Sequence, residues 1–498
     1  MRSLLCASRN RPSLRETANQ TALALASELP AYGLRPPPRS RKDEQICNQT
    51  TLKIDTLQTI IAGQFASMAI TASGPGCSST TDMLFYARLL GPSVVWVNVS
   101  KVGVCSYIAR VRPGLPGLHI LQVASEYCGI TWKDQAPDWY QPASYTGQLV
   151  VNCQLTVGAR SNHKPRPLCT FDREVGLAEQ PLSPSYHDGF WRSTVSGDHS
   201  RKWQWQYHDC QLPAWQLPAD VDGFPRIAGR ADQRVQVLML GDSVLGAQAA
   251  MLTNMVPAKW TVNASYLKWS FDYAPTLAKF KRMACATHMP ADVVVYNSGI
   301  HDFYVRTDLR EKIRSRSTKF AASLRWDPKV YHEHLAHALD TLEACHPHAL
   351  KIYRTTTSAW GKFGNFVANW TRLEPLWSSW HAIEHVHHLE LEFFRQRAPK
   401  YRTWKILDGF FPTVSRPDCV ENNPAQPGAA HIHPCDDALD AMNCELLSVI
   451  DASLVGDHIR SSARPHHKYS VNTPPAPSPG ILGAAGVASG SPTYSPRR

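Results

Sequence analysis

The chain has 498 residues, of which 43% are hydrophobic, and this is enough for two or three domains with a large core. Its formal charge is +11, but residues 1–45 and 456–498 contribute +4 each, which leaves only +3 for the rest. A nucleic-acid groove needs basic residues gathered on the folded part, so we exclude nucleic acid as a partner. Both basic ends are predicted to be disordered tails.

The cysteines and the glycosylation motifs favour the secretory pathway. None of the 13 cysteines forms a Cys-x-x-Cys pair, so we expect disulfides and neither a metal nor a cofactor. The number is odd, so at least one thiol stays unpaired in the monomer, and Cys6 is the candidate. Asn-x-Ser/Thr motifs, which accept N-glycans, are present at Asn19, Asn48, Asn98, Asn263 and Asn369.

The first residues give an incomplete targeting signal. Met1–Ala7 begins like a signal peptide, but Arg9 and Arg11 interrupt the apolar stretch. No stretch approaches the roughly 20 apolar residues of a membrane span, so the chain does not indicate membrane association. We expect a protein of the Golgi lumen or the extracellular space whose true N-terminus is missing from this chain.

Residues 46–160 are predicted to form an antiparallel β-sandwich. Short apolar segments alternate there with turns that contain Gly and Pro, at a spacing of about 8–12 residues. The expected strands are 65–70, 83–90, 94–99, 107–111, 118–123 and 148–157. A connector rich in Trp, Pro and Cys follows over residues 161–225.

From residue 235 onwards the pattern changes to alternating strands and helices. Such alternation predicts an α/β fold with a parallel sheet and flanking helices, here within a domain over residues 161–455. The expected strands are 235–240, 293–296, 350–353 and 405–407, and the expected helices are 244–252, 331–344, 377–397 and 437–450.

Polar motifs follow three of these strands, where ligands bind in open α/β sheets. Ser243 stands directly behind the strand 235–240, in a turn that exposes it near the positive end of a helix. A serine needs an adjacent base to become a nucleophile, and His433 or His431, before the last helix, would supply it. The backbone N–H groups of Ser243 and Gly299, with the Asn297 side chain, would form the oxyanion hole.

These motifs resemble the PC-esterase branch of the SGNH/GDSL hydrolase superfamily, which includes neurexophilin-and-PC-esterase proteins and trichome-birefringence-like O-acetyltransferases. Gly241-Asp242-Ser243 resembles the nucleophile block, and Gly299–Asp302 resembles the G-x-N-D block, with His301 in place of Asn. The resemblance covers roughly residues 165–452 and also rests on the segments 188–191, 203–213, 354–356 and 415–418. The preceding sandwich is similar to an immunoglobulin or filamin domain.

The resemblance implies several site residues. Cys169 and Cys210 would pair, and the catalytic histidine would be His433 or, alternatively, His431. The D-x-x-H motif that ends the family pattern is absent, since Ala430 and Gly428 stand three residues before these histidines. The orienting acid would be Asp418, with Asp408, Asp436 and Asp437 as alternatives.

The activity implied is O-acetylation of a glycan or polysaccharide through an acyl-serine intermediate, with an acyl donor and a glycan acceptor as partners. An acylesterase with the same residues is an alternative, because access of water to the pocket separates the two reactions. A catalytically inactive member of the family that binds a glycan or a partner is a further alternative. The histidines between His381 and His388 are interpreted as a packed or solvated helix face, not as metal ligands.

Overall fold

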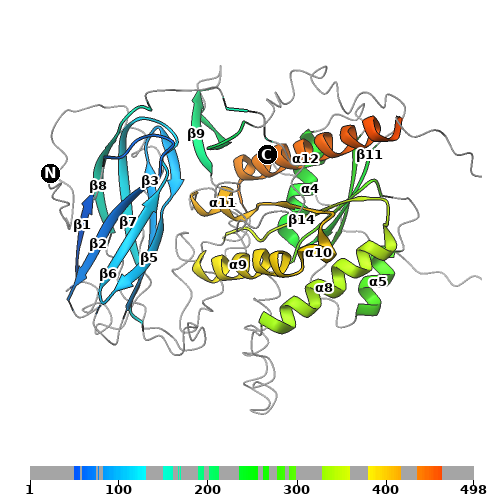
Figure 1. Ribbon diagram of the computed structural model, residues 1–498, viewed down its shortest axis with the longest axis horizontal. Coiled ribbons are helices and arrows are strands. Elements are labelled where there is room, and N and C mark those ends of the chain that lie inside the picture. Colours follow the sequence, from blue (N-terminus) through cyan, green and yellow to red (C-terminus); the bar gives the residue numbers. More distant parts are fainter. Residues whose placement is uncertain are drawn as a thin grey trace, which may run out of the picture. The chain divides into compact units, whose positions relative to one another are not determined.

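The computed structural model contains two antiparallel sheets and one parallel sheet among its described residues (Figure 1). The described residues are 50–56, 59–74, 77, 82–130, 150–160, 166–167, 169, 189–195, 201–211, 235–255, 262–268, 277–285, 291–298, 328–358, 380–416 and 434–462.

The two antiparallel sheets form the predicted sandwich. One has the order β1 (Thr51–Thr56), β2 (Ala66–Ser73), β6 (Ser106–Val111), β5 (Asn98–Gly103). The other has the order β10 (Arg201–Tyr207), β9 (Gly189–Val195), β4 (Ser93–Trp96), β3 (Asp82–Leu90), β7 (Gly117–Ile130), β8 (Val150–Val157). The predicted strand 94–99 is therefore divided between β4 and β5, which belong to different sheets.

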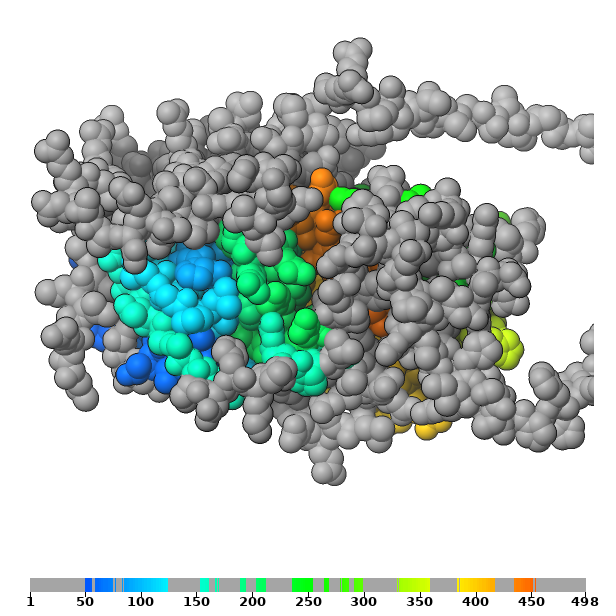
Figure 2. Space-filling view, turned by 90° about the horizontal axis from the view of Figure 1, so that it is seen from above, coloured from blue at the N-terminus to red at the C-terminus, as the bar shows by residue number. Residues whose placement is uncertain are grey.

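Alternating side chains explain why these sheets pack face to face. Along β2, every second residue is buried, as expected for a strand with one face on a core. Ile70 of the first sheet lies in the same core cluster as Phe85, Leu121 and Leu155 of the second, and each is 3% exposed or less. In Figure 2, blue and cyan atoms of the sandwich strands lie closely against one another. Assignment of the sandwich to the immunoglobulin or filamin type stays a prediction.

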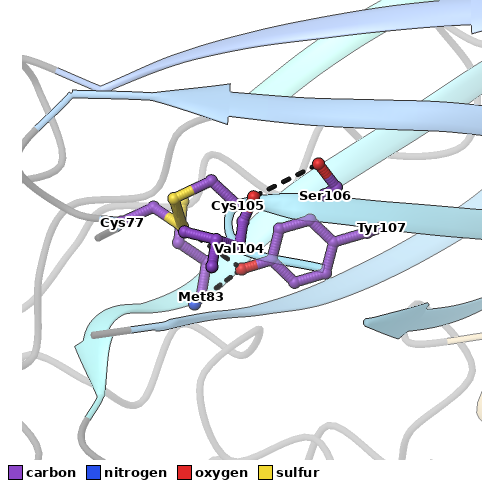
Figure 3. The surroundings of a disulfide bond; sticks show 6 residues. All are labelled: Cys77, Met83, Val104, Cys105, Ser106 and Tyr107. Carbon is purple, nitrogen blue, oxygen red and sulfur yellow. Dashed lines mark hydrogen bonds between the residues drawn. A yellow bond between two sulfur atoms is a disulfide. The ribbon is translucent and has the colours of Figure 1, made fainter. Parts of the chain in front are cut away.

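A disulfide joins Cys77, in the connection between β2 and β3, to Cys105, in the turn between β5 and β6 (Figure 3). Cys105 lies between β5 and β6 and has a positive φ of 53°, which is uncommon for a residue other than glycine. Next to the disulfide, the Tyr107 hydroxyl of β6 accepts a hydrogen bond from the Met83 N–H of β3 at 3.1 Å. The disulfide therefore links the β2–β3 connection to the β5–β6 turn, and the hydrogen bond links β3 to β6.

The third sheet is parallel throughout and has the order β12 (Val262–Lys268), β11 (Val235–Gly241), β13 (Val293–Tyr296), β14 (Leu350–Arg354), β15 (Trp404–Leu407). By position in the chain this is the order 2-1-3-4-5 of doubly wound folds, in which ligands bind where the winding reverses. The reversal lies between β11 and β13. The predicted strands are thus all present, while β12 was not predicted.

Helices cover both faces of this sheet, because successive residues of a strand point to opposite sides. Val237 and Met239 of β11 pack on the side of α4 (Ser243–Met255) and α12 (Asp436–Ser462). Leu238 and Leu240 pack on the side of α5 (Leu277–Cys285), α8 (Pro328–Cys345), α9 (Trp380–Gln396) and α10 (Ala398–Tyr401). The helix α12 continues past residue 456, where we predicted the tail.

The connector contributes to both folds. Its hairpin β9–β10 extends the six-stranded sheet through pairing of β9 with β4. Trp191 of β9 donates a hydrogen bond through Nε1 to the Pro412 carbonyl at 2.9 Å, in the short helix α11 (Phe410–Val414) behind β15. Tyr86 of β3 likewise donates to the Val414 carbonyl at 3.1 Å. Sheet residues of the sandwich therefore hold a helix of the α/β fold.

Most of the cysteines that the structure describes are in disulfides, which is typical of a secreted or extracellular protein. The pairs Cys169–Cys210 and Cys285–Cys345 form disulfides beside Cys77–Cys105, and the first of them is the pair that the family resemblance implied. Cys444 is a free thiol of α12, and burial raises its pKa to about 12. Cys6 lies outside the described residues. Among the described helices, none combines the length and hydropathy needed to cross a membrane.

Candidate functional site

The Gly-Asp-Ser turn joins β11 directly to α4. Asp242 Oδ1 accepts hydrogen bonds from the N–H groups of Val244 and Leu245, both at 3.0 Å, and so caps the start of α4. Ser243 is the first residue of α4 and is half-buried. It therefore stands at the positive end of a helix, next to the point where the winding of the sheet reverses.

Asn297, directly behind β13, binds this turn with both ends of its side-chain amide. Its Oδ1 accepts from the Asp242 N–H at 3.1 Å, and its Nδ2 donates to Asp242 Oδ2 at 3.2 Å. A Cβ atom at Gly241 would lie 2.2 Å from Asn297 Oδ1, so only glycine permits this close approach. The structure thus gives Asn297 a holding role that the sequence did not predict, and its role in an oxyanion hole stays a prediction.

Arg354, the last residue of β14, adds a buried positive charge to the same turn. Its side chain is fully buried, and Nη2 lies 3.5 Å from Asp242 Oδ1. Burial lowers the pKa of Arg354, whereas the Asp242 carboxylate acts in the opposite direction and favours the charged form. The sequence singled out Arg354 through the family motif, but nothing in the motif indicated this partner.

Tyr266 of β12 supports the turn from the other side. Its hydroxyl donates to the Asp242 carbonyl at 2.7 Å and lies 3.2 Å from the Gly241 carbonyl. A Cβ atom at Gly246 of α4 would come within 2.8 Å of the Tyr266 ring, so the ring packs directly against the helix backbone. The small residue at 246, one turn into the helix, was the only signal for this contact in the sequence.

The described acids that we considered for orienting the histidine have other partners. Asp408 is buried, and its Oδ1 accepts from the N–H groups of Phe410 at 2.7 Å and Phe411 at 3.1 Å, at the start of α11. Asp437 Oδ2 lies 3.6 Å from Arg416 Nη2, and Asp436 is exposed. These contacts assign Asp408 and Asp437 to the support of α11 and of the residues behind it.

The remaining predicted site residues lie outside the described residues: Gly299, His301, Asp418, His431 and His433. The structure therefore brings Ser243 and Asn297 together and leaves the base, the acid and the second backbone donor as predictions. In the histidine-rich helix α9, His387 is buried with its ring stacked on Phe410 at 4.8 Å, as expected for a packed face.

Comparison with known proteins finds solved structures of low similarity to the chain. No protein-family model matches the chain, and no curated protein matches it. A family two carbohydrate esterase from Clostridium thermocellum, solved with cellohexaose, is 12% identical with a TM-score of 0.26, over 80% of this chain and 94% of that one.

Two further solved structures are similar to the chain over a shorter part of it. The periplasmic domain of a lipopolysaccharide acetyltransferase from Salmonella ser. Paratyphi A is 11% identical with a TM-score of 0.26, over 47% of this chain and 89% of that one. An extracellular lipase from Streptomyces rimosus is 12% identical with a TM-score of 0.28, over 44% and 99%. These neighbours are esterases, lipases and acetyltransferases, but at TM-scores of this size any function rests on the chain's own residues.

Proposed function

We propose that the chain is a serine-dependent acyltransferase that moves an acetyl group onto a hydroxyl of a glycan or polysaccharide. The placement of Ser243 carries the proposal. It is the first residue of α4, directly behind β11, and the turn before it is held by Asn297 and Arg354. A rigid, half-buried hydroxyl at a helix N-terminus suits a nucleophile whose attack creates negative charge nearby.

In the proposed reaction, Ser243 Oγ attacks the acyl carbon of the donor while His433, or alternatively His431, takes the hydroxyl proton. The N–H groups of Ser243 and Gly299 stabilise the oxyanion, and the leaving group departs with the proton from the histidine. The glycan hydroxyl then attacks the acyl-serine, with the same histidine as base, and the free serine is regenerated. Asp418 would orient the histidine, and Asp408, whose Oδ1 also caps the start of α11, is the alternative.

The family resemblance supports the glycan acceptor. The disulfides between described residues support an oxidising compartment, which we propose to be the Golgi lumen or the extracellular space. An acylesterase would use the same residues with water as acceptor. An inactive, glycan-binding protein is the further alternative that the absent D-x-x-H motif favours.

The test is turnover of an acyl-ester probe by the purified chain, with and without an oligosaccharide acceptor. We expect turnover that the acceptor accelerates and that Ser243→Ala abolishes. Ser265→Ala is the matched control, because Ser265 is an exposed residue of the neighbouring strand β12.

Each other outcome selects an alternative. If Ser243→Ala turns over the probe as fast as the unmodified chain, both the acyltransferase and the esterase hypotheses are wrong. Turnover that needs Ser243 but ignores the acceptor would indicate the esterase, and glycan binding without turnover would indicate the inactive protein. Comparison of His433→Ala with His431→Ala then identifies the base.

A further inference from the structure

We propose that Glu390 is a positioning residue of the candidate site, because it joins the ends of β13 and β14 through one buried hydrogen-bond cluster. The inference rests on the proposed function of Ser243. Glu390 belongs to α9, outside every segment on which the family resemblance rests, and its side chain is fully buried.

Three donors from three different segments meet at this carboxyl group. Oε1 accepts from the hydroxyl of Tyr353 in β14 at 2.8 Å and from the hydroxyl of Tyr331 in α8 at 3.1 Å. Oε2 accepts from the backbone N–H of Thr356, in the segment behind β14, at 2.9 Å. Both oxygens are thus engaged, and Glu390 fixes the segment behind β14 relative to α8.

The two tyrosines extend the cluster to the end of β13. Ser298 Oγ lies 3.1 Å from the Tyr331 hydroxyl and 3.4 Å from the Tyr353 hydroxyl. Ser298 directly follows Asn297, whose amide holds both the backbone and the carboxylate of Asp242. A continuous set of hydrogen bonds and one peptide link therefore runs from Glu390 to the residue before Ser243.

Stability alone does not account for a carboxyl group at this place. Burial raises the pKa of Glu390 to about 8, although the N–H of Thr356, the two tyrosines and the Arg354 charge all act to lower it. A raised pKa means that the folded environment disfavours the charged form, so the ionised group destabilises the fold. What the carboxyl provides is two acceptors that orient three segments at once.

The experiment compares Glu390→Gln with Glu392→Gln, whose exposed side chain lies on the same helix and pairs with Arg395. The assays are run above pH 8, where Glu390 is ionised. Gln keeps the shape but offers only one acceptor oxygen, so one of the two sets of donors loses its partner. We expect Glu390→Gln to lower kcat about tenfold or more with KM within about twofold, since small misplacements of a catalytic group have effects of this size. Glu392→Gln is expected to match the unmodified chain.

Backbone hydrogen exchange of the same variants gives a readout that needs no turnover. Glu390→Gln is expected to speed exchange in the segments 293–298 and 355–358, while thermal unfolding stays cooperative. Tyr353→Phe, which removes one donor and keeps the carboxyl, is expected to give a smaller effect of the same kind and serves if Glu390→Gln fails to fold.

Failure of the inference and failure of the proposed function are distinguishable. If the unmodified chain shows no Ser243-dependent turnover, the proposed function is wrong, and so is the expected effect of Glu390 on kcat. The exchange data would still decide whether Glu390 holds the segments 293–298 and 355–358 in place. Unchanged exchange in both segments, or a kcat no lower than that of Glu392→Gln, would overturn the inference while Ser243 kept its role.

Discussion

Removal of the Asp242 carboxylate tests the physical account of the nucleophile turn most directly. Asp242→Ala takes away the acceptor of two helix N–H groups, the partner of the Asn297 amide and the counter-charge of Arg354. Because Arg354 is fully buried, its charge would be left without its ion-pair partner and without access to water.

The magnitude follows from these three losses. A lost helix cap costs about 1 kcal/mol and an unpaired buried amide about 1 kcal/mol. Breaking a buried ion pair by removing one partner costs about 3–5 kcal/mol. The three losses share one side chain and are not additive, so we expect Asp242→Ala to lower the free energy of unfolding by about 4–6 kcal/mol. Asp242→Asn keeps an acceptor oxygen for the helix but removes the charge, and we expect about 3 kcal/mol.

The assay is urea unfolding followed by tryptophan fluorescence, with the unmodified chain and both variants at one pH. The double variant Asp242→Ala with Arg354→Met is expected to be more stable than Asp242→Ala alone, because the uncompensated charge is gone. A loss below about 2 kcal/mol for Asp242→Ala, or no recovery in the double variant, would refute the reasoning that Arg354 depends on this carboxylate.

Three further predictions concern parts of the chain away from this turn. The Cys169–Cys210 disulfide links residues that are 41 apart, so replacement of both by Ser should cost about 4 kcal/mol, and an unchanged thermal midpoint would contradict this. Burial raises the pKa of Glu445 from 4.5 to about 8, so the folded chain holds a proton that the unfolded chain releases. The free energy of unfolding should therefore fall between about pH 4.5 and pH 8 and fall less in Glu445→Gln, and equal slopes in urea titrations would count against it. Asn98 is exposed in β5, so secreted chain should lose one N-glycan in Asn98→Gln, visible as a mass difference that glycosidase treatment removes.

The sequence by itself determined where most strands lie and which serine stands out. The run Val235–Leu240 predicts a strand buried on both faces, and the structure has β11 there with Ser243 directly behind it. The short apolar segments between turns in the first half predict an antiparallel sandwich, and the two antiparallel sheets share a core. The positions of these strands were predictable because the spacing of apolar residues within a segment indicates whether it forms a strand and which of its faces are buried.

The edge strand β12 shows where such spacing fails. Its sequence, Val262–Lys268, has no continuous apolar run, because it lies at one end of the described sheet and pairs only with β11 there. Because β12 is not recognisable in the sequence, neither the strand order nor the position at which the winding reverses can be predicted from it.

Only the tertiary structure decided which side chains meet at that position. Arg354 lies 112 residues beyond Asp242, and Glu390 lies 34 residues beyond Thr356, yet each pair is in contact. Asn297 was predicted to be part of the oxyanion hole, and nothing in the sequence indicated that its amide also binds Asp242. Contacts of this kind depend on how strands are ordered and how far each side chain reaches. Periodicity within one element contains no information on either.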